Sequence, residues 1–220
     1  KLVARAIDSL ANDPDIPSAA EIDKNGDSYI DNVNFMVSGS SDSWSDLLWP
    51  HRWSYYLRAP RPALNGKYLH SYTFQLSDMY TENRPGAILE SGSLDYKGRN
   101  QLLSTFAHET MHQFGFPDLY RYNFSGTPVG QWDVMANHPE IPQYANAFMR
   151  YTVAGWGSAP QQIAGNDTYT LSAPTASNSN PKSYFYPMSN DEYLVFEYRK
   201  KTPQTWDQDI ESSGVLAYRI

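Results

Sequence analysis

The chain has 220 residues, of which 40% are hydrophobic, 15% aromatic and 19% charged. This composition is typical of one large folded domain or two lobes, and it excludes disordered, collagen-like and coiled-coil proteins. The formal net charge of -7 argues against a nucleic-acid partner, because phosphate binding requires a clustered basic surface.

Helical spacing of apolar residues predicts a helix over residues 2–11. Aromatic and β-branched residues then predict strands over residues 29–37 and 67–76. Between them, the aromatic cluster at residues 49–53 is expected to pack in a core, with no ligand role for His51.

Residues 99–114 carry an apolar stripe spaced three and four apart, which predicts a second helix with a stop at Gly115. Residues 144–154 predict another helix. Antiparallel strands are expected over residues 169–171, 192–198 and 214–220, and the intervening residues 158–190 are otherwise rich in loops. In the strand over 192–198, we expect Glu197 to be half-buried and paired with Arg199. Helices and strands therefore mix without strict alternation, which predicts an α+β fold.

Two absences narrow the chemistry. The chain contains no cysteine, which excludes disulfides, thiolate zinc ligands and a cysteine nucleophile. No run of 18 apolar residues occurs, so we expect no membrane span. The chain begins at lysine and ends within an expected strand, so we expect it to be a piece of a longer protein.

A metal site is predicted on the second helix. His108 and His112 lie one helical turn apart on the same face, so both imidazoles can reach one ion. Zinc binds histidine nitrogen at about 2.0–2.1 Å, and catalytic zinc typically has three protein ligands and one open position. Glu109 lies beside the ion, where it can take a proton from water and pass it to a leaving amine.

The third ligand is expected just beyond the helix. Gly115 can end the helix in a left-handed conformation, after which Asp118 is placed to offer an oxygen to the same ion. The alternative is that the Asp118 carboxylate caps its own loop, with His138 or Glu140 as the third ligand. His138 and Tyr144 are also candidate donors to the negative charge that develops on a substrate carbonyl oxygen.

The helix and loop together resemble a known motif. His-Glu-x-x-His-x-x-Gly-x-x-Asp, starting at His108, resembles the metzincin zinc motif with aspartate in the place usually held by a third histidine. The longer string HETMHQFGFPDLY is similar to the immune inhibitor A (thuringilysin-like) family of secreted bacterial metallopeptidases. The resemblance also covers residues 23–31, 48–53, 130–135, 155–156, 192–199 and 214–216.

The resemblance implies a secreted bacterial zinc endopeptidase of metzincin architecture that acts on proteins or peptides. A mixed sheet and the active-site helix would form an N-terminal lobe, residues 1–115, and a strand-rich C-terminal lobe would follow, residues 116–220. A methionine-bearing turn underlies the metal in this architecture, and Met135 is the matching residue. A propeptide and further domains outside the chain are also expected.

An Asp-rich loop before the first strand predicts a second cation site. Side-chain oxygens on alternate residues, together with one carbonyl, are the ligands that calcium prefers. The candidate ligands are Asp23, Asn25, Asp27, Tyr29 and Asp31. The spacing departs from an EF-hand at Ser28 and Asn34, but the resemblance implies a structural calcium ion here. The alternative is an ordinary Asx-rich turn.

Two other functions compete with proteolysis. One is a catalytically silent, metal-stabilised module that binds protein or polysaccharide. The other is a zinc hydrolase that acts on non-peptide amides or cell-wall crosslinks, since such an enzyme would share all of this chemistry. A digestion assay with and without a chelator separates the binding module from the peptidase.

Overall fold

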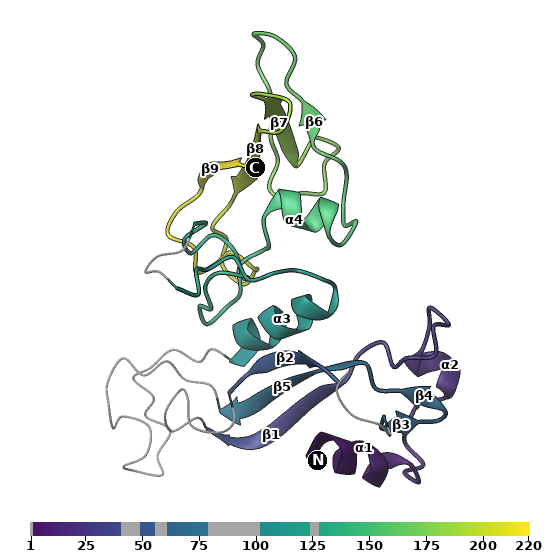
Figure 1. Ribbon diagram of the computed structural model, residues 1–220. Helices are drawn as coiled ribbons and strands as arrows, with labels where there is room; N and C mark the ends of the chain where they lie inside the picture. The colour runs from purple at the N-terminus through teal and green to yellow at the C-terminus, as the bar shows by residue number, and fades with distance from the viewer. Residues whose placement is uncertain (1, 41–48, 56–60, 79–101, 124–127) are drawn as a thin grey trace, which may run out of the picture. The chain divides into compact units, whose positions relative to one another are not determined.

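The structure is a computed structural model that describes residues 2–40, 49–55, 61–78, 102–123 and 128–220 (Figure 1). These residues form a mixed α and β fold, which confirms the predicted α+β class. The chain divides into two compact units, Lys1–Asp78 and Met79–Ile220. Among the described residues, no helix is long and apolar enough to cross a membrane.

A three-stranded mixed sheet organises the first unit (Figure 1). In spatial order its strands are β1 (Asn34–Ser40), β5 (Ser71–Asp78) and β2 (His51–Ser54). β1 runs parallel to β5 and pairs Phe35 with Phe74, whereas β2 runs antiparallel to it. As the central strand, β5 is buried almost continuously from Ser71 to Leu76.

Both predicted strands of the first unit need correction. The strand expected over residues 29–37 begins only at Asn34, and Tyr29 forms an isolated parallel bridge with Tyr68 instead. The strand expected over residues 67–76 is two strands, β4 (Lys67–Tyr68) and β5. β4 pairs with β3 (Ala63–Leu64) through a tight turn at Asn65 and Gly66, both with positive φ.

The first core lies between the N-terminal helix and this hairpin. Helix α1 (Leu2–Leu10) is amphipathic, as predicted, and buries Ile7. Ile7 packs with Ile30 and with two residues of the hairpin region, Leu64 and Leu69. A short helix, α2 (Ala19–Ile22), precedes the Asp-rich loop. The predicted core role of the cluster at residues 49–53 is wrong for Trp49 and Trp53, which are 49% and 54% exposed.

A four-stranded sheet and two helices make up the second unit. The helices are α3 (Leu102–Gln113) and α4 (Ala147–Thr152), and the strands are β6 (Gln161–Gln162), β7 (Ser183–Pro187), β8 (Tyr193–Arg199) and β9 (Gly214–Arg219). The sheet order is β6-β7-β8-β9, with antiparallel pairing except between β6 and β7. The strands predicted over 192–198 and 214–220 are therefore confirmed.

The strand predicted over residues 169–171 is wrong. Tyr169 instead exchanges hydrogen bonds through its hydroxyl with the backbone of Ala164, and its ring packs edge-on against Tyr184. Tyr184 belongs to β7, a strand in a stretch that the sequence indicated to be mostly loop. Residues 169–171 are therefore held by the side-chain contacts of Tyr169 and not by strand pairing.

The ends of α3 and α4 follow local rules. Gly115 has a φ of 91°, which confirms the predicted glycine stop after α3. Residues 99–101 of that predicted helix lie outside the described residues. α4 begins at Ala147 rather than at 144, because the Asn146 side chain caps it by accepting from the backbone N–H of Met149. α3 lies in the second compact unit, and the predicted boundary after residue 115 stays a prediction.

Candidate metal centre

Three side chains converge at one point, two from the C-terminal half of α3 and one from the loop that follows it. The Nε2 atoms of His108 and His112 lie 3.1 Å apart. Asp118, in the loop that follows Gly115, places Oδ1 at 2.9 Å from the His108 Nε2 and 3.2 Å from the His112 Nε2. The structure therefore brings the three predicted ligands together in a nearly equilateral triangle.

The triangle has the dimensions of one face of a tetrahedral zinc site. With bonds of about 2.0–2.1 Å, neighbouring ligand atoms around a tetrahedral ion lie about 3.3–3.4 Å apart. The observed separations of 2.9, 3.1 and 3.2 Å are only slightly shorter. Small rotations of the side chains would bring all three atoms to bonding distance from one ion.

The protonation of the two imidazoles supports the same conclusion. The Nδ1 of His108 lies 3.0 Å from the Val134 carbonyl oxygen, and that of His112 lies 2.6 Å from the Phe116 carbonyl oxygen. A carbonyl oxygen only accepts, so each Nδ1 carries a proton, and the tautomer in which Nδ1 is the only protonated nitrogen presents the lone pair of Nε2 to an ion. Backbone carbonyls are common partners of metal-bound histidines.

Asp118 completes a set of facing acceptors. Its Oδ1 is buried and, among the described residues, receives no hydrogen bond of normal geometry. Two nitrogen lone pairs and a carboxylate oxygen would repel one another at these distances, and a bound cation removes that repulsion. When no ion is bound and the Nε2 atoms carry protons, burial raises the pKa of Asp118, but hydrogen bonds from His108, His112 and Tyr122 outweigh it and hold the pKa well below its usual range.

Glu109 lies within the same group. Its carboxylate and the imidazole nitrogens of His108 and His112 lie within 4.8 Å of one another, so these residues could hold a metal ion. Glu109 is buried on α3, with 7% of its surface exposed. A carboxylate beside an ion, rather than between its ligands, is placed to exchange a proton with water there.

The predicted methionine turn lies beside the ligands. Met135 is fully buried in a core with Met111 and Phe116, which flank the metal-binding residues in sequence. Its carbonyl oxygen accepts a hydrogen bond from the Leu119 N–H at 2.8 Å, and the preceding carbonyl, that of Val134, accepts from His108. The turn thus contacts both the helix and the loop that carry the ligands.

The two candidate charge-stabilising residues have different surroundings. The His138 ring packs edge-on against His108, with centroids 4.3 Å apart. Burial and the His108 imidazole lower the pKa of His138 to about 3, so its ring is neutral. The Tyr144 ring instead contacts Trp206 and the Arg150 guanidinium. Glu140, the other alternative ligand, is exposed.

Two tyrosines that the sequence analysis did not identify also contact the site. The Tyr122 hydroxyl donates to Oδ2 of Asp118, which leaves Oδ1 to face the imidazoles. Partial burial and Asp118 raise the pKa of Tyr122 to about 12, so the hydroxyl keeps its proton. Tyr120 stacks on His108, with centroids 6.2 Å apart. The signal that could have found them is the position of both tyrosines within four residues of Asp118.

In the Asp-rich loop, Asp23 is saturated by protein donors. Its Oδ1 accepts from the backbone N–H groups of Gly26 and Asp27, and its Oδ2 accepts from that of Ser28. Oδ2 also forms an ion pair of 2.6 Å with Lys67, whose ammonium lowers the pKa of Asp23. These are the bonds of an Asx turn closed by a cation from the protein itself.

The other predicted calcium ligands make similar local bonds. Asn25 accepts from the Asp27 N–H and donates to its carboxylate, and Asp27 accepts from the Tyr29 N–H. Asp31 accepts from the Lys24 N–H. These contacts are those of the Asx-rich turn that the sequence left as the alternative, and calcium in this loop stays a prediction.

Comparisons with known proteins do not identify the chain. A scan against models of protein families finds no match, and a search of curated proteins finds no relative. The resemblance to the immune inhibitor A family therefore stays an expectation from the motif residues.

Proposed function

We propose that this chain is a catalytic region of a zinc-dependent endopeptidase, of metzincin type, that hydrolyses peptide bonds in protein substrates. His108, His112 and Asp118 would hold the zinc ion, and Glu109 would act as the general base. In keeping with the resemblance, we place the protein outside a bacterial cell, with peptides or proteins as its partners.

One observation carries the proposal: the Nε2 atoms of two imidazoles and one carboxylate oxygen face each other at 2.9–3.2 Å. Each ring is held through its Nδ1 by a backbone carbonyl, and the carboxylate is held by Tyr122. Two imidazoles and one carboxylate are a ligand set of catalytic zinc, whereas calcium and magnesium prefer oxygen ligands throughout.

The chemistry follows from the residues around this triangle. A zinc ion held there would supply Lewis-acid activation of water and of the scissile carbonyl. Glu109 would accept the proton that water loses during attack and deliver it to the departing amide nitrogen. His138, neutral and packed on His108, stays the candidate donor to the substrate oxygen.

The test measures zinc content and proteolysis on the same protein. We expect the purified chain to bind one zinc ion and to digest casein, and a chelator to abolish the digestion. Glu109→Gln removes the base but keeps the size of the side chain, so this variant should retain zinc and lose about 100- to 10,000-fold in turnover.

The control for Glu109→Gln is Glu211→Gln, the same substitution at an exposed glutamate of the second unit, which should leave zinc binding and turnover near wild type. Zinc-loaded Glu109→Gln with full activity would show that the base lies elsewhere. A zinc-loaded wild-type chain without any hydrolytic activity would favour the silent binding module. Elemental analysis of the same sample also tests whether the loop at residues 23–31 binds calcium.

A further inference from the structure

Two consecutive carbonyls hold both parts of the candidate metal centre. The Val134 carbonyl accepts from Nδ1 of His108, on α3, at 3.0 Å. The Met135 carbonyl accepts from the N–H of Leu119, next to the ligand Asp118, at 2.8 Å. We call residues 132–137 the carbonyl segment. A displacement of this segment would move a histidine ligand and the carboxylate ligand together.

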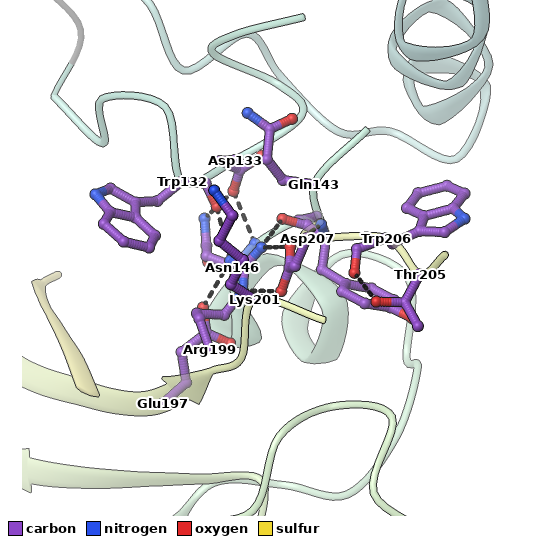
Figure 2. A network of polar contacts seen from close by, with 12 residues as sticks. Trp132, Asp133, Gln143, Asn146, Glu197, Arg199, Lys201, Thr205, Trp206 and Asp207 are labelled. Carbon is purple, nitrogen blue, oxygen red and sulfur yellow. Dashed lines mark hydrogen bonds and ion pairs between the residues drawn. The ribbon is translucent and has the colours of Figure 1, made fainter. Parts of the chain in front are cut away.

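A buried arginine of β8 binds the beginning of the carbonyl segment. Arg199 is fully buried, and its Nη1 donates to the Trp132 carbonyl at 2.7 Å. Its Nη2 donates to the Tyr144 carbonyl at 3.0 Å, on the stretch that leads into α4. Figure 2 shows Arg199 reaching from its strand toward Trp132 and Asp207. One planar guanidinium thus joins two loop stretches to the sheet.

Asp207 fixes the orientation of that guanidinium. Its Oδ2 accepts from Nε of Arg199 at 2.7 Å, and its Oδ1 accepts from Nη2, which makes the pair bidentate. Oδ1 also accepts from the Tyr144 N–H at 3.0 Å. Asp207 has a φ of 73°, a left-handed conformation that persists in a non-glycine residue only where its surroundings enforce it.

Within the carbonyl segment, Asp133 continues the same network (Figure 2). Its Oδ1 accepts from the Met135 N–H at 2.8 Å, and its Oδ2 accepts from both the backbone and side-chain N–H groups of Asn146 at 2.7 Å. The turn is therefore fixed internally by Asp133 and anchored to the sheet by Arg199.

We propose that Arg199 and Asp207 are positioning residues for the metal centre. They hold the carbonyl segment so that Val134 keeps His108 in the tautomer with a free Nε2 and Met135 keeps the Asp118 loop in place. This inference rests on the proposed function, because it assumes that His108 and Asp118 bind zinc. Neither Arg199 nor Asp207 touches the ion or the substrate.

The test is the zinc affinity of Arg199→Lys, measured on the whole chain by competition with a chromophoric chelator. Lysine keeps the positive charge near Glu197 and Asp207 but lacks the fork that reaches the Trp132 and Tyr144 carbonyls together. We expect zinc affinity to fall about 10- to 100-fold, the usual effect of losing an outer partner of a metal ligand. The absorption spectrum of the cobalt-substituted variant should change as well.

Tyr218→Phe is the matched control. The Tyr218 hydroxyl donates to Glu197, which also pairs with Arg199, so its loss perturbs the same buried network without removing a bond to the carbonyl segment. This variant should have a lower Tm and an unchanged zinc affinity. The affinity is measured at a temperature where circular dichroism shows a folded protein.

Wild-type affinity in Arg199→Lys, or an equal loss of affinity in Tyr218→Phe, would overturn the positioning role. If Arg199→Lys does not fold, Asp207→Asn replaces it, since asparagine keeps the shape but puts an N–H₂ group against the donors of Arg199 and Tyr144. A wild-type chain that binds no zinc would overturn the metal centre itself, and this result is distinct from either variant outcome.

Discussion

His108 and Asp118 bring an imidazole nitrogen and a carboxylate oxygen to 2.9 Å although one lies on a helix and the other in the loop beyond it. The left-handed Gly115 lies between them and lets the chain turn back toward its own helix. The short separation makes Asp118 the third member of the site, and Asp118 is the one proposed ligand of the three whose ionised side chain carries a negative charge.

Asp118→Asn should therefore weaken zinc binding more than any change in the surrounding residues. Asparagine has nearly the same size but no negative charge, so we expect a loss of affinity larger than the roughly 10- to 100-fold cost of losing an outer partner. Isothermal titration of the metal-free protein with zinc measures the change. Asp167→Asn, at an exposed aspartate of the second unit, is the control and should bind zinc normally.

Tyr122→Phe should lower zinc affinity without unfolding the protein. The hydroxyl of Tyr122 donates to Oδ2 of Asp118, and its loss lets the carboxylate rotate away from the position that presents Oδ1. We expect about a 10- to 100-fold decrease in affinity, with a Tm close to wild type because Tyr122 is 75% exposed. Tyr186→Phe removes another exposed tyrosine hydroxyl, in β7, and should change neither quantity; equal affinities in both variants would refute the role of Tyr122.

Acid should destabilise the metal-free protein in part through His138. The folded pKa of about 3 lies below the ordinary value of 6.5, so the unfolded chain binds this proton more readily. The stability contributed by a neutral His138 is complete above pH 6.5 and is lost as the pH falls toward 3. Its share of the slope is at most about 1.4 kcal/mol per pH unit.

The free energy of unfolding in urea, measured at several pH values for the metal-free wild type and for His138→Gln, tests this contribution. The variant should lose stability less steeply between pH 6.5 and 3. His70→Gln, at an exposed histidine of the first unit, controls for the removal of any imidazole. Parallel curves for wild type and His138→Gln would show that His138 is not held neutral.

Asp23→Ala should destabilise the first unit. Three backbone N–H groups and the Lys67 ammonium would lose their acceptor, and the amides of this turn are partly buried. We expect a lower midpoint of urea unfolding than for Asp15→Ala, at an exposed aspartate of the same unit. The experiment is repeated with added calcium and with a chelator. A midpoint that rises with calcium in the wild type but not in Asp23→Ala would support the calcium site.

Much of the candidate metal centre could be predicted from the sequence, because it depends on local geometry. The turn of an α-helix determines that His108 and His112 share a face, and the glycine stop determines where the chain leaves α3. Asp118 follows within six residues of His112, so only a short loop had to be placed. The strands β8 and β9 could also be predicted locally, since each is a short segment in which apolar and aromatic residues predominate.

The errors arose where side chains compete with the backbone for hydrogen bonds. Asp23, Asn25 and Asp27 bind the amides of their own loop as far as Tyr29. Tyr29 then forms an isolated bridge with Tyr68, and β1 begins only at Asn34. Tyr169 likewise bonds to the backbone through its hydroxyl. A sequence pattern indicates the secondary structure that a residue prefers. It does not indicate which group will form hydrogen bonds with that residue in the folded protein.

The sequence by itself determined which residues could bind a metal, because ligand type and helical spacing are properties of a short segment. Only the tertiary structure decided how those ligands are held. Val134 orients His108 from 26 residues away, and Arg199 reaches Trp132 from 67 residues away. Such contacts form only when distant segments pack together, since the free energy that brings them together comes from burial of the whole core rather than from any local pattern.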